Sequence, residues 1–276
     1  ITLKCGCINM KKVFIIGNGF DLNLGLKTSY QCFISSPEFQ RKASEGNTLF
    51  NYLNDVVNVD GWIDVENELV SYSNEPFSEM NFLGEYNELC DCLKRYISSI
   101  DMFCIDKQSS AFEMLKSIDL SDDFLIVNFN YTDSVLHILE ELGHENVQNK
   151  ILHVHGRVAT DEIVFGVDDK AGINPEHVFL YKSYSSIFGE KYDVSNIVDF
   201  EHFYFFGHSL GQSDHLYFKD MFGWLTHKGS KSKMVKFYHY SQRSKEAIVR
   251  QLQDLTNNKL GLLKMKISFA EDYSEK

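Results

Sequence analysis

This sequence has few prolines and fewer basic than acidic residues. Its 276 residues include only 3 prolines, and 39 acidic residues against 27 basic ones give a net charge of −12. A protein that binds nucleic acid through the phosphate backbone needs an excess of Lys and Arg on one face. We therefore expect no large nucleic-acid-binding surface. Four lysines cluster at positions 228, 231, 233 and 236, and we interpret them as a solvated turn that leads into a strand.

Long apolar runs are also absent. No stretch approaches the roughly 20 apolar residues of a membrane-spanning helix. The first nine residues, ITLKCGCIN, are too short and too polar for a secretory signal, and Met10 with two lysines after it reads as a natural start. These features predict a soluble, cytoplasmic protein without a membrane partner.

The six cysteines lack the spacing of a metal site. Two C-x-C pairs occur, Cys5/Cys7 and Cys90/Cys92. A structural zinc site normally combines two pairs with wider, C-x₂₋₄-C spacing. We interpret the cysteines as small apolar residues of a reducing compartment. The sequence therefore predicts no metal site and no disulfide framework.

Short apolar runs alternate with helical segments along most of the chain. Runs of strand length lie at residues 13–16, 124–127, 151–154, 163–165, 203–206, 234–238 and 262–267. A helical apolar period marks residues 131–142 and 245–255. Fully apolar strands are typical of a sheet that is buried on both faces. The alternation predicts an α/β fold with a doubly wound, mostly parallel sheet of the Rossmann-like type.

One long segment breaks this alternation. Residues 31–119 contain no convincing strand, and their apolar period is helical, for instance at Phe82, Tyr86, Leu89 and Leu93. No proline- or serine-rich linker interrupts the segment, so we expect it to pack on the sheet. The sequence thus predicts a single α/β domain over residues 1–276, with a helical insert at residues 31–119 after the first strand.

A glycine-containing turn, Gly17-Asn18-Gly19-Phe20-Asp21, directly follows the first strand. Ligands of open α/β sheets bind at the carboxyl ends of the strands. Glycines there let a phosphate approach the backbone closely, and their N–H groups can bind it. The third glycine of the dinucleotide fingerprint is missing, which disfavours a hydride-transfer enzyme. The alternative is a tight strand-to-helix turn with Asn18 in a left-handed conformation.

Polar residues also follow the second and third of the expected sheet strands. Asn130 comes after the second strand, where it can hold a sugar hydroxyl or a water. Asp133 is either a helix cap or a binding residue. In the HVHG sequence at residues 153–156, alternation places both histidines on one face of the strand. His155, at the strand end, is the candidate general base, and His153 is the candidate packed residue.

A second glycine-containing turn, GHSLGQSD at residues 207–214, follows the apolar run 203–206. Its first five letters match the G-x-S-x-G turn that carries the nucleophile of serine hydrolases. Ser209 would then need an acid and a histidine later in the chain, and the available candidates are Asp214, Asp220, His227 and His239. In the hydrolase fold these partners come after further strands, so the spacing favours Ser209 as a binding residue.

Two further carboxylates, Asp64 and Glu66, lie inside the helical segment. Acidic residues near a helix start interact favourably with the positive end of the helix dipole. The same carboxylates can reach over the sheet edge to a bound nucleotide. The sequence leaves both roles open.

Six motifs together resemble a known protein family. They are VFIIGNGFDLNLGLKTSY, GWIDVE, FNYTDS, LHVHG, IVFGVDD and FFGHSLGQSDH, in this order. The series is similar to the AbiH-type abortive-infection family of bacterial antiphage proteins, from about residue 13 to beyond residue 214. More distantly, it resembles the sirtuin-like NAD-binding fold.

The sirtuin-like resemblance implies roles for particular residues. Its G-x-G turn, which holds the dinucleotide phosphates, falls on Gly17 and Gly19, and its asparagine after a central strand falls on Asn130. Its catalytic histidine falls on His155, and its later G-x-S turn, on the adenosine side, falls on residues 207–209. Two departures disfavour protein deacetylation: the four-cysteine zinc module is missing, and the first turn differs from the fuller G-A-G-x-S sequence.

The resemblance therefore implies an antiphage effector that cleaves NAD. Asn130 and His155 are its expected catalytic residues, and no metal or separate cofactor is expected because NAD is the substrate. The expected nucleotide-binding residues are Gly17, Asn18, Gly19, Phe20, Asp21, Asp133, Gly207, His208, Ser209 and Asp214. The alternatives are a nucleotide sensor without hydrolase activity and, less favoured, a serine hydrolase or nuclease. A homo-oligomer or a phage-sensing partner protein fits this class of effector.

Overall fold

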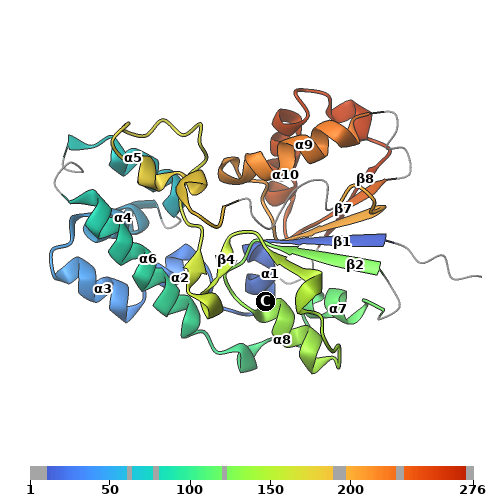
Figure 1. The fold of residues 1–276 in the computed structure, drawn as a ribbon, viewed down its shortest axis with the longest axis horizontal. Helices are drawn as coiled ribbons and strands as arrows, with labels where there is room; N and C mark the ends of the chain where they lie inside the picture. The colour runs from blue at the N-terminus through green and yellow to red at the C-terminus, as the bar shows by residue number, and fades with distance from the viewer. Residues whose placement is uncertain are drawn as a thin grey trace, which may run out of the picture.

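The computed structural model describes residues 11–60, 64–76, 81–119, 123–188, 197–227 and 233–271 (Figure 1). Several features of the sequence lie outside these ranges, namely Cys5, Cys7, Met10, residues 61–63, Lys228 and Lys231. Within the described ranges, no helix is long and apolar enough to cross a membrane.

One parallel sheet contains β1 (Lys11–Ile16), β2 (Asp123–Asn128), β3 (Ile151–His153), β6 (His202–Phe206), β7 (Met234–His239) and β8 (Ile267–Glu271). The strand order is β3-β2-β1-β6-β7-β8, and every neighbouring pair is parallel. The predicted α/β fold with a parallel sheet is confirmed. Strand order reverses between β1 and β6, and ligands of open α/β sheets bind at such a switch point.

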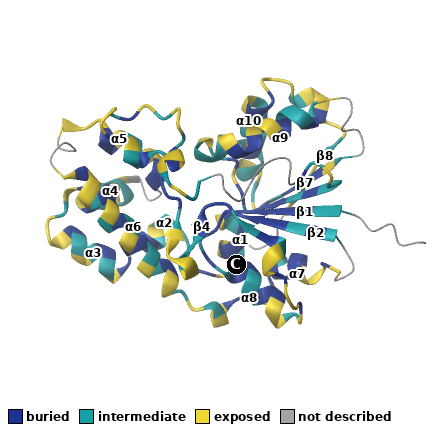
Figure 2. Cartoon of the chain, in the orientation of Figure 1, coloured by how far each residue is buried: buried dark blue, intermediate teal, exposed yellow. Residues whose placement is uncertain are grey.

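Helices cover both faces of this sheet (Figure 1). Because side chains alternate along a strand, Val13 and Ile15 of β1 face one core, whereas Phe14 and Ile16 face another. The first core includes residues of α9 (His215–Leu225) and α10 (Gln242–Leu255). The second includes residues of α1 (Asn18–Asn23), α7 (Ser110–Lys116) and α8 (Ser134–Glu141). Figure 2 shows the strands buried between these layers.

The predicted helical segment after β1 is confirmed, and most of it has a core of its own. This part contains α2 (Tyr30–Ile34), α3 (Pro37–Ser44), α4 (Thr48–Asp60), α5 (Val65–Ser73) and α6 (Phe82–Ser98). Phe165, Val167, Ile173 and Leu180 complete its core from a later part of the chain. We call α2–α6 and residues 163–182 the helical lobe. α7, at the end of the predicted insert, packs instead on the sheet beside α8.

Two apolar runs differ from the expected strands. The run 163–165 contributes to β5 (Glu162–Ile163), which pairs antiparallel with β4 (Gly156–Arg157) outside the main sheet. The chain turns back at Gly156, where φ is +71° and a Cβ atom would lie 2.1 Å from the Glu162 carbonyl oxygen. In the run 262–267, residues up to Leu263 form a 3₁₀ helix, and the strand starts only at Ile267. Apolar character alone does not distinguish a buried turn of helix from a strand.

Helix boundaries also shift for local reasons. α8 starts at Ser134, later than expected, because residues 129–133 form a loop across the strand ends. α10 starts earlier than expected, since Ser241 and Ser244 form a reciprocal capping box. Further 3₁₀ helices lie at Met102–Cys104, Gln148–Lys150, Val158–Thr160, Val178–Leu180, Lys182–Tyr184 and Gln212–Asp214.

Candidate active site

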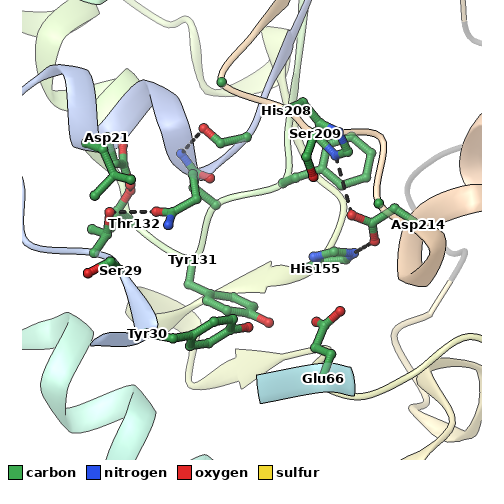
Figure 3. A pocket seen from close by; sticks show the side chains of 18 of the residues that line it. Asp21, Ser29, Tyr30, Glu66, Tyr131, Thr132, His155, His208, Ser209 and Asp214 are labelled. Carbon is green, nitrogen blue, oxygen red and sulfur yellow. Dashed lines mark hydrogen bonds and ion pairs between the residues drawn. The ribbon is translucent and has the colours of Figure 1, made fainter. Parts of the chain in front are cut away.

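The carboxyl ends of β1 and β6 border a cavity of about 340 Å³ that the helical lobe closes from the other side (Figure 3). Residues selected from the sequence that line it are Gly17, Asn18, Asp21, Asn130, His155, Gly207, His208, Ser209 and Asp214. The other three selected residues, Gly19, Phe20 and Asp133, are not among the lining residues. The lobe adds Tyr30, Asp64 and Glu66. The cavity thus lies at the switch point of the sheet, where a ligand is expected.

The two glycine-containing turns pack directly against each other. Gly207 has a left-handed φ of +67°, and a Cβ atom there would lie 2.1 Å from the Phe20 nitrogen. A Cβ atom on Gly17 would lie 2.8 Å from the Gly207 oxygen and the His208 Cα. A Cβ atom on Gly19 would lie 2.7 Å from the Gly207 Cα. Glycine is therefore required at these three positions by contact between the turns.

N–H groups of the first turn are used within the protein. Gly17 donates to the Phe206 carbonyl at 3.0 Å, and Gly19 donates to the Gly207 carbonyl at 2.9 Å. The fold thus already supplies acceptors for these two N–H groups, and this does not support their expected role in binding a phosphate. Asn18 starts α1 and is not left-handed, since Gly17 makes the turn with an extended backbone (φ −122°, ψ −176°).

Asp21 lines the cavity although its side chain is fully buried. Its carboxylate oxygens accept hydrogen bonds from Ser134 Oγ at 2.6 Å and from Thr132 Oγ1 at 2.7 Å. Burial raises the pKa of Asp21 to about 6, against the opposing effect of these hydroxyls and of Asn130. The carboxylate is therefore mostly ionised at neutral pH, and its negative charge disfavours a phosphate beside it.

Asn130 connects the loop after β2 to the turn after β1. It is buried, its backbone N–H donates to Asn128 Oδ1 at 3.0 Å, and its side-chain nitrogen donates to the Gly17 carbonyl at 3.2 Å. Because this nitrogen is committed to the fold, the side-chain oxygen is the group that Asn130 can offer to a ligand hydroxyl.

Two histidines approach the carboxylate of Asp214 from different loops (Figure 3). Nε2 of His155 lies 3.1 Å from Oδ1, and Nε2 of His208 lies 3.4 Å from Oδ2. The Leu210 N–H donates to Nδ1 of His208 at 3.0 Å, so the proton of neutral His208 is on Nε2 and faces Asp214. Phe129 holds both rings edge-on, with centroid distances of 5.3 Å to His155 and 4.4 Å to His208.

A buried lysine joins this group to the helical lobe. Lys182 is 1% exposed, and its Nζ lies 2.9 Å from Asp214 Oδ1 and 3.2 Å from Glu66 Oε2. Burial opposes the charge of Lys182, but the two carboxylates raise its pKa, so it stays protonated. Burial likewise opposes ionisation of Asp214, yet Lys182 and His155 hold its pKa well below the ordinary value. Burial raises the pKa of Glu66, which therefore takes up a proton more readily than Asp214.

Tyr30 and Tyr131 form an aromatic wall of the cavity. The Tyr131 hydroxyl donates to the Val164 carbonyl at 3.1 Å, and its ring centroid lies 6.3 Å from that of His155. Burial raises the pKa of both tyrosines well above the ordinary value, so both hydroxyls stay neutral. Figure 3 shows the two hydroxyls directed toward the part of the cavity where Glu66 lies.

Asp133 and His153 form a separate polar group. The Asp133 carboxylate accepts a hydrogen bond from Arg157 at 3.0 Å, lies 3.9 Å from His153 Nε2, and makes no capping hydrogen bond. The prediction that His153 and His155 share one strand face does not hold, because β3 ends at His153 and the chain turns before His155. His153 is not among the residues that line the cavity.

Asp64 and Glu66, whose roles the sequence left open, differ in role: Asp64 caps a helix, and Glu66 lies in the cavity wall. Asp64 caps α5 by accepting from the Asn67 N–H at 3.3 Å, although it also lines the cavity. Glu66 is buried and points into the cavity opposite His155 (Figure 3). The start of α5 thus places the Asp64 carboxylate at the helix cap and the Glu66 carboxylate inside the cavity.

Ser209 lacks the partners of a catalytic serine. It is exposed, and no hydrogen bond described in the structure joins its hydroxyl to a histidine. Asp214 is engaged by Lys182 and by the two histidines of the cavity. Apart from Gly207, the left-handed residue of this turn is Leu210, with φ +55°, and not Ser209. These features argue against the serine hydrolase interpretation.

Several residues of the cavity were not selected from the sequence. They are Tyr30, Tyr131 and Thr132 in its wall, together with Ser134 behind Asp21 and Lys182 behind Asp214. Thr132 and Ser134 follow the same strand as Asn130, so their position at a strand end was a usable signal. Lys182 follows no strand of the sheet and no glycine turn, and no sequence pattern marks it. Within the described part of the chain, no group of three or more His, Cys, Asp or Glu side chains is arranged to hold a metal ion.

Comparison with known proteins gives one match. The family model described as "Bacteriophage abortive infection AbiH" matches residues 13–104 and 83–236, which together span most of the 276 residues. Neither a curated protein nor a solved structure matches the chain.

Proposed function

This chain belongs to the bacteriophage abortive infection AbiH family, and we propose that it is an effector that hydrolyses NAD to nicotinamide and ADP-ribose. Depletion of NAD would stop the metabolism of an infected cell, which fits an abortive-infection role. The observation that carries the proposal is that Asn130 and His155 share one cavity at the switch point of the parallel sheet. The strand order is also that of dinucleotide-binding doubly wound sheets.

The proposed reaction breaks the bond between C1′ of the ribose and the nicotinamide nitrogen. The bonding electron pair leaves with nicotinamide, which becomes neutral, and positive charge develops on the ribose. Water adds to C1′ and loses one proton, so NAD⁺ and water give nicotinamide, ADP-ribose and one proton. The protein has to position the ribose, stabilise the positive charge and accept the proton.

His155 accepts this proton, and Asn130 holds the ribose. The Asp214 carboxylate, 3.1 Å from Nε2 of His155, stabilises the imidazolium, so Nδ1 on the other side of the ring takes the proton. The side-chain oxygen of Asn130 accepts a hydrogen bond from a ribose hydroxyl. Glu66, opposite His155, supplies negative charge near the developing cation (Figure 3).

Incubation of purified protein with NAD in isotope-labelled water tests the reaction. We expect nicotinamide and ADP-ribose in equal amounts, with one labelled oxygen on C1′ of the ADP-ribose. Asn130→Ala is expected to lower the rate without loss of fold, because the ribose is no longer held in place. Intact NAD after incubation with folded wild-type protein, also when phage-infected cell extract is added, would contradict the proposal.

A second candidate is a sensor that binds a nucleotide or NAD derivative without cleaving it. Two observations favour it: the N–H groups of the first turn are already bonded, and the cavity volume of about 340 Å³ is small for a complete dinucleotide. Small-molecule sites range from about 300 to 1,000 Å³, so this cavity suits a ligand of nucleoside size. Ligand binding without nicotinamide release, followed by association with a partner protein or a second copy of the chain, would identify the sensor.

A further inference from the structure

The walls of the cavity carry much more negative than positive charge. Carboxylates of Asp21, Asp64, Glu66 and Asp214 line it, and the lining residues within the described ranges include no Lys or Arg. Lys182 compensates part of this charge from behind, through its contacts with Glu66 and Asp214. In a site of low dielectric, this excess repels anions and attracts cations more strongly than it would in water.

Aromatic rings face the same space as these carboxylates. Tyr30 and Tyr131 line the cavity, and their hydroxyls point toward the part where Glu66 lies (Figure 3). Both hydroxyls stay neutral, so the two side chains add aromatic surface to the cavity wall without charge of their own. Aromatic faces together with carboxylates are the walls with which proteins bind quaternary nitrogen cations.

A buried ring nitrogen in this wall also points to a ligand. His155 is 5% exposed, and its Nε2 lies 3.1 Å from Asp214 Oδ1. This contact is an ion pair and not a hydrogen bond, and the buried nitrogen has no hydrogen-bond partner within the described residues. Buried polar atoms in folded proteins nearly always have such a partner. Since His155 lines the cavity, a molecule bound there is the candidate for the missing partner.

We propose that the side of the cavity formed by Tyr30, Tyr131 and Glu66 binds a positively charged, planar nitrogen heterocycle, the pyridinium ring of oxidised NAD. This inference rests on the proposed function and deepens it, because it fixes which end of the dinucleotide enters. The ring enters the acidic part of the cavity, and the phosphates stay outside it. The site therefore selects the oxidised, cationic form of the cofactor against the reduced, neutral form.

Two small probes separate charge from shape: 1-methylnicotinamide, which is cationic, and nicotinamide, which is neutral. Neither has a ribose, so binding is read without cleavage, by ligand-observed NMR at millimolar concentrations. In wild-type protein, we expect the cation to bind about tenfold or more tightly than the neutral ring, which corresponds to about 1.4 kcal/mol. Glu66→Gln should remove most of this preference.

Matched variants keep the test interpretable. Glu68→Gln removes the same charge two residues further along α5, where Glu68 accepts from the Tyr52 hydroxyl outside the cavity, and should leave the preference intact. If Glu66→Gln does not fold, Tyr30→Leu and Tyr30→Phe replace it. Leucine should lower the preference by about threefold or more, and phenylalanine should retain it, because a cation interacts with the ring face.

Each outcome bears on one of the two proposals. Equal binding of the two probes to folded wild-type protein, or no binding of either, overturns the pyridinium site. A preference that survives in folded Glu66→Gln overturns the role of the acidic wall and thus the inference. If NAD is cleaved but the probes bind equally, the proposed function stands and this inference fails. If the cation is preferred but NAD is never cleaved, the site stands and the hydrolase proposal fails.

Discussion

The sheet and the helical lobe build the cavity in different ways. The sheet supplies Asn130, His155 and Asp214 from loops after β2, β3 and β6, where backbone contacts between neighbouring turns fix their positions. The lobe supplies Tyr30 and Glu66 from helices that are held by apolar packing around a separate core. One side is therefore set by strand-end geometry, and the other by how the lobe docks on the sheet.

Removal of Lys182, which links the two sides of the cavity, should lower the stability of the protein more than the other changes below. Lys182→Met leaves the buried carboxylate of Glu66 and the largely buried one of Asp214 without their shared cation. We expect the free energy of unfolding to fall by about 3–5 kcal/mol, as for other broken buried ion pairs. Denaturant unfolding measures this, with the exposed Lys170→Met as the control that should stay within about 0.5 kcal/mol of wild type. Equal stability of the two variants would show that the buried ion pairs do not hold the lobe.

Disruption of the turn contact should destabilise the sheet side almost as strongly. Gly207→Ala forces a Cβ atom to within 2.1 Å of the Phe20 nitrogen at a left-handed φ of +67°. The expected loss is about 2–4 kcal/mol of unfolding free energy, read from thermal or denaturant unfolding. Gly223→Ala in α9 meets nothing within 4 Å and should be neutral or slightly stabilising. If Gly207→Ala is as stable as Gly223→Ala, the turns do not depend on this close contact.

Asp21 should make the stability of the protein depend on pH through the sheet side of the cavity. Its pKa is raised from 3.8 in a free chain to about 6 in the folded protein, so the folded state binds the proton more tightly. This contribution to stability is complete below about pH 4 and is lost as the pH rises through about 6, to a total of about 3 kcal/mol. Asp21→Asn should remove this fall. Parallel stability curves of variant and wild type between pH 4 and pH 7 would exclude the effect.

A single hydrogen bond from the β2 loop to the helical lobe should give the smallest effect. Tyr131→Phe removes the donor to the Val164 carbonyl but keeps the ring in the cavity wall. We expect a loss of about 1 kcal/mol in unfolding free energy. Tyr184→Phe, on a residue that is 67% exposed, is the matched control and should change nothing measurable. A Tyr131→Phe variant as stable as this control would mean that the bond adds no stability to the docking.

The difference between the sheet side and the lobe side explains which parts of the site could be predicted from the sequence. Asn130, His155 and Asp214 could be found because polar residues after apolar runs meet at one edge of a parallel sheet. Most strands could be predicted because fully apolar runs mark a sheet that is buried on both faces. The run 163–165 was placed in the wrong sheet because the left-handed turn at Gly156, which redirects the chain, leaves no apolar signal.

The lobe side could not be predicted in this way. Glu66 could be named but not assigned, because the direction of a helix-start carboxylate depends on how the helix packs. Lys182 is far from Glu66 and Asp214 in the sequence and belongs to a different structural element. Only the folded chain brings the three side chains together. The internal hydrogen bonds of the first turn could not be predicted for a related reason. A glycine that makes room for a ligand and a glycine that makes room for a neighbouring turn cannot be distinguished in a sequence.

The two histidines near β3 provide the most direct test of the central claim, that His155 acts in NAD cleavage. The measurement is the initial rate of nicotinamide release from NAD by wild type, His155→Ala and His153→Ala, each shown to be folded by circular dichroism. Because His155 lines the cavity and His153 does not, we expect His155→Ala to be slower by about 10²–10⁴-fold and His153→Ala to stay near the wild-type rate. A folded His155→Ala variant at the full rate, or a folded His153→Ala variant without activity, would contradict the account.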